Sequence, residues 1–142
     1  MKRKINIDKR SMPRGIRPCA FLLGGVSYMA LETLWRGRTH PGMGVVGGTC
    51  MAAFCTLRHR HRGGLLSLCL RGSAMITAAE LLYGTFLNRE RTVWDYSELP
   101  LNWRGQICAR YSFFWCLLCL PMCAFARLLE RHLCRVDSLR RK

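Results

Sequence analysis

Acidic residues are scarce in this chain of 142 residues, which has 8 Asp and Glu against 23 Lys and Arg and a formal net charge of +15. An excess of this size is typical of nucleic-acid binders and of membrane proteins with basic loops. The positions of the cations separate the two classes, because most of them lie between long apolar runs rather than within them. The sequence therefore favours an all-α membrane protein, and no nucleic-acid partner is expected.

Familiar catalytic motifs are missing as well. The sequence contains no G-x-S-x-G nucleophile elbow, no H-E-x-x-H zinc motif and no G-x-x-x-x-G-K-[ST] phosphate-binding loop. It also shows no internal repeat and no low-complexity tract. We therefore expect that the chain is not an enzyme, that it hydrolyses no ATP and that it holds no cofactor.

Four apolar runs dominate what is present, and each is close to the 17–25 residues that a helix needs to cross about 30 Å of hydrocarbon. They predict a bundle of about four transmembrane helices over residues 18–35, 41–57, 63–87 and 107–126. The second run is short and rich in glycine, so it is alternatively tilted, re-entrant or packed closely against a neighbour. Basic tails at residues 1–17 and 127–142 flank the bundle, and one long loop covers residues 88–106.

The Lys and Arg outside the spans predict the orientation. With both termini in the cytoplasm, sixteen of these cations are cytoplasmic and five are external, while two more lie within the spans. Cytoplasmic segments normally carry the excess of Lys and Arg. The rule therefore predicts a multi-pass protein of the cell membrane with both ends inside and the long loop outside. Its basic tails would also contact the headgroups of membrane lipids.

The nine cysteines would indicate a disulfide framework in a small secreted chain. Six of them lie well inside apolar runs, where a thiol acts as a small hydrophobic group. These six are Cys50, Cys55, Cys69, Cys116, Cys119 and Cys123. The last three share one helical face and would suit a soft metal, but no His or carboxylate accompanies them, and we expect no metal site.

Ionisable side chains inside a bilayer are costly enough to need a reason. Glu32, Glu80 and Arg110 lie in the outer halves of the predicted spans, where an Arg that faces a carboxylate lowers the cost of burying either charge. One hypothesis is that these residues and Asp95 form a polar site, open to the outside, that binds a ligand or a coupling ion. The alternative is that they lock the helices together. His40, next to an external helix end, is a further candidate for the site.

The long loop is rich in amphipathic rings. Trp94, Tyr96 and Trp103 prefer the headgroup level, where they anchor helix ends. Pro100 excludes a regular helix through its own position, and Asn102 suits a turn. The loop is therefore either a roof over the polar site or an aromatic belt with no further role.

One specific motif, WDYS-x-x-P-x-N-x-x-G-Q-I-C, runs from Trp94 to Cys108. Two Gly-Gly pairs, an intramembrane Glu and an Arg-Gly-x-[ST]-His turn precede it. The motif positions besides the acids and His40 are Gly24, Gly25, Arg36, Gly37, Gly47, Gly48, Gly84, Asn88, Trp94, Tyr96, Ser97, Pro100, Asn102 and Gly105. In these residues the chain resembles the small membrane proteins grouped as putative ABC-transporter type IV, which are common in Firmicutes. Arg110 occupies a position that is uncharged in that family, so the resemblance does not support it.

The resemblance implies a permease-like component of a transport system that associates with further copies of itself or with other transporter subunits. The candidate ligand or coupling-ion residues are then Glu32, His40, Glu80 and Asp95. Arg110 is a further candidate because a charged side chain inside a bilayer is costly. The alternative function is a non-transporting membrane scaffold or sensor. Such a protein would bind a partner membrane protein or lipid headgroups through the WDYS loop and the basic tails.

Overall fold

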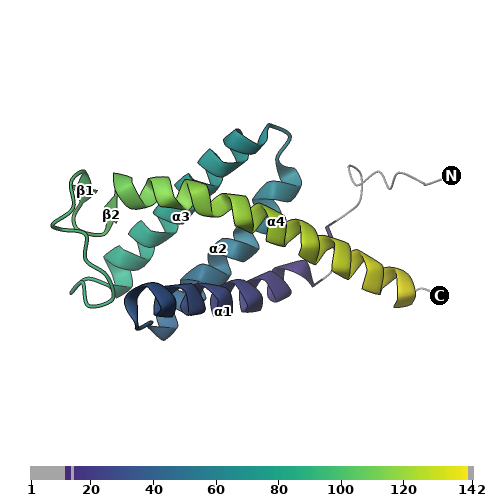
Figure 1. The fold of residues 1–142 in the computed structure, drawn as a ribbon, viewed down its shortest axis with the longest axis horizontal. Helices are drawn as coiled ribbons and strands as arrows, with labels where there is room; N and C mark the ends of the chain where they lie inside the picture. Colours follow the sequence, from purple (N-terminus) through teal and green to yellow (C-terminus); the bar gives the residue numbers. More distant parts are fainter. Residues whose placement is uncertain (1–11, 14, 141–142) are drawn as a thin grey trace.

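The chain forms four helices joined by two short turns and one long segment (Figure 1). The computed structural model describes residues 12, 13 and 15–140, so most of the basic arm expected at 1–17 lies outside the described residues. The helices are α1 (Ile16–Arg36), α2 (Pro41–Arg60), α3 (Leu65–Leu87) and α4 (Ala109–Arg140). Between α3 and α4, β1 (Asn102–Trp103) pairs with β2 (Ile107–Cys108) in a small antiparallel hairpin. The predicted all-α class is confirmed.

The fourth helix is longer than the apolar run that predicts it. It continues through residues 127–140, which the sequence suggests as a basic tail. This extension stays helical because Leu129 and Leu133 pack against a buried cluster at the start of α1 that includes Ile16. Pro121 lies inside α4, where it removes one backbone hydrogen bond, and the helix continues past it.

A tight turn makes α1 and α2 neighbours, as the short connection between their predicted spans indicates. Gly37 ends α1 with a φ of 71°, and its N–H donates to the carbonyl of Thr33 at 2.8 Å. A left-handed conformation of this kind is accessible to glycine at little cost. His40 then caps α2, because its Nδ1 accepts a hydrogen bond from the N–H of Gly42 at 3.1 Å.

Small residues let the backbones of α1 and α2 approach closely. A Cβ atom on Gly25 would lie 2.6 Å from the carbonyl oxygen of Gly44, and one on Gly48 would lie 2.5 Å from that of Phe21. These distances are too short for any real Cβ, so neither position accepts even alanine without moving a helix. Close packing through small residues is a common mode of helix association in membranes.

The helices α3 and α4 meet through hydrogen bonds as well as packing. The hydroxyl of Ser73 donates to the carbonyl of Ser112 at 2.5 Å, and the hydroxyls of Thr77 and Ser112 lie 2.9 Å apart. Phe54 of α2 is fully buried. It lies in a core cluster formed by residues of α2, α3 and α4, including Cys119 of α4. The fold therefore consists of two helix pairs that share one apolar core.

Two helices among the described residues are long and apolar enough to cross a membrane: α3 with 23 residues, and α4 over the 31 residues Ala109–Leu139. α1 and α2 have 21 and 20 residues, a sufficient length, but their glycines and polar residues make them less apolar. The start of α1 and the end of α4 lie at one end of the molecule, and β1 and β2 lie at the other (Figure 1). We call these the termini end and the loop end.

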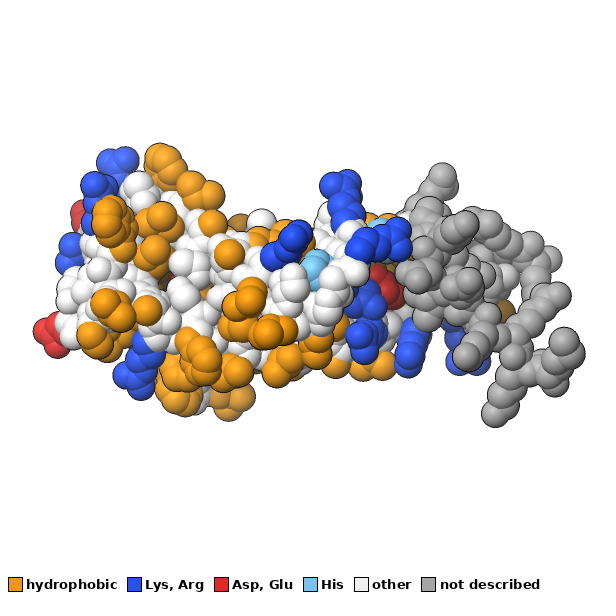
Figure 2. All heavy atoms as spheres, turned by 90° about the horizontal axis from the view of Figure 1, so that it is seen from above, with side chains coloured by type: hydrophobic (Ala, Val, Ile, Leu, Met, Phe, Trp, Pro, Cys, Tyr) orange, Lys and Arg blue, Asp and Glu red, His pale blue; other side chains and the backbone are white. Residues whose placement is uncertain are grey.

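Large apolar side chains cover the outside of the helices, as on the face in Figure 2. Among the exposed ones are Leu22, Val26, Leu34, Trp35, Leu66, Leu70, Leu82, Phe86, Phe113 and Leu117. Lys and Arg gather towards the termini end of this face, and a few flank the loop end. Soluble proteins rarely expose such extensive apolar surface, which is the surface that lipid tails cover in a membrane.

Candidate functional site

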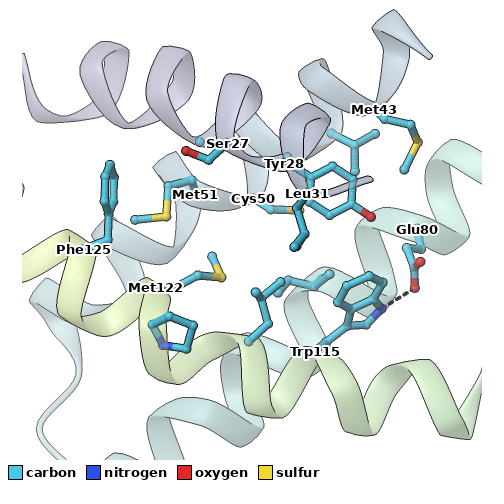
Figure 3. Close-up of a pocket in the computed structure, with 16 residues that line it drawn as sticks. Ser27, Tyr28, Leu31, Met43, Cys50, Met51, Glu80, Trp115, Met122 and Phe125 are labelled. Atoms are coloured by element: carbon cyan, nitrogen blue, oxygen red, sulfur yellow. Dashed lines mark hydrogen bonds between the residues drawn. The ribbon is translucent and has the colours of Figure 1, made fainter. Parts of the chain in front are cut away.

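The buried carboxylate of Glu80 is the centre of the site. Glu80 lies on α3 with 3% of its surface exposed. Its Oε1 accepts a hydrogen bond from the hydroxyl of Tyr96 at 3.1 Å. Its Oε2 accepts one from the indole N–H of Trp115 at 2.7 Å, the dashed line in Figure 3. Both donors are neutral. Among the described residues, the buried ion pairs involve Glu32 and Glu130, and none involves Glu80.

Tyr96 brings the WDYS loop into contact with the helices. Its ring stacks on Tyr111 of α4 with centroids 4.5 Å apart, and its N–H donates to the carbonyl of Gly105 at 2.9 Å. Burial raises the pKa of Tyr96 well above its usual value, and the charge of Glu80 raises it further. The hydroxyl therefore stays protonated and serves as a donor to Glu80.

A second buried network fixes the loop to the end of α3. The side-chain amide of Asn88 donates to the carbonyl of Trp94 at 2.8 Å, and that of Gln106 donates to the carbonyl of Asn88 at 2.9 Å. The indole N–H of Trp94 donates to the carbonyl of Gln106 at 2.9 Å. A Cβ atom on Gly84 would collide with the Gln106 side chain. These contacts explain why the motif residues Gly84, Asn88 and Trp94 occur together.

Asp95 shapes the loop and lies away from Glu80. Its Oδ1 accepts hydrogen bonds from the N–H of Ser97 at 2.9 Å and from the Ser97 hydroxyl at 2.5 Å. These bonds hold the pKa of Asp95 below its usual value. Asn102 closes the same turn, because its side chain bonds the carbonyls of Ser97 and Leu99 and the N–H of Gly105. The side chain of Asp95 is exposed, so the geometry assigns it to the turn.

Glu32 is the second buried carboxylate, with 7% of its surface exposed. It forms an ion pair with Arg36 at 3.3 Å and accepts a hydrogen bond from the hydroxyl of Thr39 at 2.6 Å. Arg36 also donates to the carbonyl of Val93 at 3.3 Å. This group links the end of α1 to the WDYS loop, and the charge of Glu32 is neutralised within it.

Two cavities lie between the helix pairs. The central cavity, of about 210 Å³, is lined by residues of all four helices, including Glu80 and Phe125 (Figure 3). The loop-end cavity, of about 310 Å³, is lined by α1, α4 and the WDYS loop, including Glu32. The two cavities share the lining residues Tyr28, Leu31, Met43 and Trp115. They are therefore adjacent, and these four side chains form the partition between them.

The structure does not place every candidate at this site. Arg110 is exposed, and its guanidinium lies 5.9 Å from the ring centroid of Phe114. No ion pair in the described part of the chain joins it to Glu32 or Glu80. His40 is exposed and serves as the cap of α2. Of the five candidates, Glu32 and Glu80 line the cavities.

Three residues of the site are missed by sequence reasoning. Nothing in the local sequence around Trp115 indicates that its indole faces a carboxylate on another helix. The role of Tyr28 in the partition depends on a helix pairing that the sequence alone does not show. Gln106 offered the best signal, because a buried amide next to a turn usually bonds backbone groups.

The cysteines of α4 lie apart from other metal-ligating side chains in the described residues. All nine cysteines lie in the described residues and are free thiols. Within residues 12–13 and 15–140, no group of three or more His, Cys, Asp or Glu side chains is arranged to hold a metal ion. Cys119 and Cys123 pack in the apolar core.

Comparison with known families gives one result. The family model described as "Putative ABC-transporter type IV" matches residues 27–140, which is most of the chain. No curated protein and no solved structure matches the sequence. The matched region includes the WDYS loop, Glu80 and the partition residues, and the family together with the two apolar helices indicates a membrane location. The resemblance seen in the sequence motifs is thereby confirmed, and the chain belongs to the putative ABC-transporter type IV family.

Proposed function

We propose that the chain is a permease-like component of a transport system. All four helices cross the membrane, both ends are cytoplasmic and the WDYS loop is external. The observation that carries this proposal is the carboxyl group of Glu80, which lies buried beside a cavity between helices and has no cationic partner among the described residues. Ionisable groups at such positions in membrane proteins usually mark the path of a substrate or an ion.

The arrangement of the cavities supports a path. The loop-end cavity and the central cavity follow one another along the bundle, and Glu80 lines the second of them. Tyr28 and Trp115 stand between the two, with ring centroids 6.3 Å apart. Movement of these two side chains would join the cavities, so the partition lies where a gate between them would be expected.

The lengths of α1 and α2 support four crossings. At 1.5 Å of rise per residue, helices of 21 and 20 residues span about 30 Å, which is the thickness of the hydrocarbon core. Their less apolar faces are covered because the glycines of α1 pack on those of α2. Transport would require further copies or other subunits, and ATP hydrolysis would require a separate subunit because this chain has no phosphate-binding loop.

Native thiols provide a test of the path. Cys50 lines the central cavity, whereas Cys69 and Cys119 are equally buried and line neither cavity. Membranes are treated with a small methanethiosulfonate reagent, and the modification of each cysteine is followed by mass spectrometry. We expect Cys50 to react faster than both controls. Equal reactivity of the three thiols would contradict an accessible path.

Orientation is tested in intact cells with single cysteines in a cysteine-free background. Ser97→Cys should react with an impermeant thiol reagent, and Arg60→Cys and Ser138→Cys should not. The opposite pattern would put the WDYS loop in the cytoplasm and would make docking of a cytoplasmic partner the better interpretation.

One observation favours the alternative function, a non-transporting scaffold or sensor. In β1 and the residue before it, 82% of Leu101 and 60% of Trp103 are exposed, which suits contact with a lipid headgroup layer or with a membrane partner. A scaffold would retain a stable partner in native pull-downs and lose it on Trp103→Ala. A permease whose loop only anchors a helix end would keep its associated subunits in that variant.

A further inference from the structure

We propose that the central and loop-end cavities bind a small organic cation, with an alkylated ammonium group held between Glu80, Tyr28 and Trp115. The inference goes beyond the proposed function by naming a ligand class. It rests on that function only for the location of the site, because binding does not require transport.

Aromatic rings provide the first argument. Seven of the eleven residues that line the loop-end cavity are aromatic. Tyr28 and Trp115 line both cavities, and their rings are inclined to each other by 53° at 6.3 Å. An alkylated ammonium is attracted to the faces of such rings, and aromatic cages are the usual way in which proteins recognise it.

Charge provides the second argument. Glu32 is paired with Arg36, so the loop-end group is neutral. Glu80 receives only an indole N–H and a phenol hydroxyl, and an indole can only donate. Its Oε2 accepts the indole N–H, and among the described residues no guanidinium or ammonium group bonds either oxygen. The guanidinium of Arg36, which also lines the loop-end cavity, is engaged by Glu32 and by the carbonyl of Val93. A monocation is the ligand that complements this site.

The walls exclude a hydrated inorganic ion. Calcium and magnesium need about six or more oxygen ligands, whereas the central cavity offers the Glu80 carboxylate among thioethers and rings such as Met43, Met122 and Phe125 (Figure 3). An alkylated ammonium needs no such shell. An apolar cavity of about 150 Å³ accommodates benzene, so the central cavity of about 210 Å³ takes one ring with a small cationic group.

The full-length protein in lipid nanodiscs tests the proposal, with benzyltrimethylammonium as the probe. Binding is measured by saturation-transfer NMR against empty nanodiscs. Glu80→Gln keeps the size of the side chain and an acceptor oxygen but removes the charge, and we expect it to weaken binding about tenfold. Glu90→Gln removes the same charge from an exposed loop position and should bind as the wild type does.

A second variant guards against misfolding of Glu80→Gln. Tyr28→Leu removes one ring of the cage and leaves both hydrogen bonds of Glu80 intact, and it should also weaken binding severalfold. Absence of wild-type binding above empty nanodiscs, or equal binding by the Glu80 and Glu90 variants, would overturn the proposal. If Cys50 reacted faster than its controls but no cation bound, this inference would be overturned and the proposed function would not. Protection of Cys50 from the thiol reagent by the cation would support the inference.

Discussion

The two helix pairs are held together by different means. α1 and α2 meet through glycines, with Gly25 against the backbone of Gly44. α3 and α4 meet through side-chain hydrogen bonds from Ser73, Thr77 and Trp115. The pair with the more apolar composition thus has side-chain hydrogen bonds across its interface, whereas close packing of glycines joins α1 and α2.

This difference indicates that the two helix interfaces have different roles in the bundle. In a bilayer, lipid tails solvate apolar side chains as well as a protein core does, so shape and hydrogen bonds decide which helices associate. The glycine interface between α1 and α2 uses no polar group. The α3–α4 interface contains Glu80, which bonds donors from α4 and from the WDYS loop. The second pair therefore contributes the buried carboxylate, whereas the first pair contributes cavity walls such as Tyr28 and Met43.

The glycine interface should be the least tolerant of change. Gly25→Val places a branched side chain against the backbone of Gly44, which cannot turn away, and we expect a loss of about 3 kcal/mol in the free energy of unfolding. Ala30→Val adds two methyl groups at an exposed position of α1 and should be nearly neutral. The thermal midpoint of each purified variant in detergent checks this. A stable Gly25→Val protein would show that the helices do not approach so closely.

Loss of the buried carboxylate should have the next largest effect. Glu80→Leu leaves the indole N–H of Trp115 and the hydroxyl of Tyr96 without an acceptor, which costs about 2 kcal/mol. The part of the WDYS loop around Tyr96 should also loosen, because it loses its bond to α3, while the Asn88–Gln106 network still holds the loop to the end of that helix. Trypsin cleavage after Arg89 and Arg104 should become faster than in the wild type. The same cleavage rate in both proteins would show that Tyr96 is held by its stack on Tyr111 alone.

Much of the fold follows from the apolar runs and the turn signals. The first three runs differ by no more than three residues at either end from α1, α2 and α3. The fourth prediction ends early, because the helical extension depends on packing of Leu129 and Leu133 near Ile16, and such a contact between distant segments has no local signal.

The candidate site was only partly predictable from the sequence. Depth along a helix is readable from residue number, so Glu32 and Glu80 could be identified as buried acids. The direction in which a side chain points around the helix axis cannot be predicted with the same accuracy, since it changes by about 100° from one residue to the next. Arg110 therefore points outward although its neighbour Tyr111 packs under Tyr96.

A smaller effect should distinguish hydrogen bonds between helices from those within one helix. Ser73→Ala removes the bond to the carbonyl of Ser112, and bonds of this kind in membrane proteins contribute about 0.6 kcal/mol. Thr56→Ala removes a bond to the carbonyl of Ala52 on the same helix and should change the thermal midpoint less. Equal shifts in the two variants would mean that the polar contacts do not hold α3 against α4.

The smallest effect concerns the Asp95–Ser97 turn of the WDYS loop, which connects α3 to α4. Hydrogen bonds from Ser97 lower the pKa of Asp95 in the folded loop, so ionised Asp95 stabilises the turn above its unfolded pKa of about 3.9. That contribution is lost as the pH falls through the lower folded value. Hydrogen exchange at Ser97 should therefore be slow at neutral pH and accelerate, relative to the intrinsic rate, below about pH 4. Asp95→Asn keeps an acceptor oxygen and has no charge to titrate, so its protection should not change over this range. If the variant showed the same pH profile, another acid would be responsible for the effect. The Asp95–Ser97 turn would then not depend on the charge of Asp95.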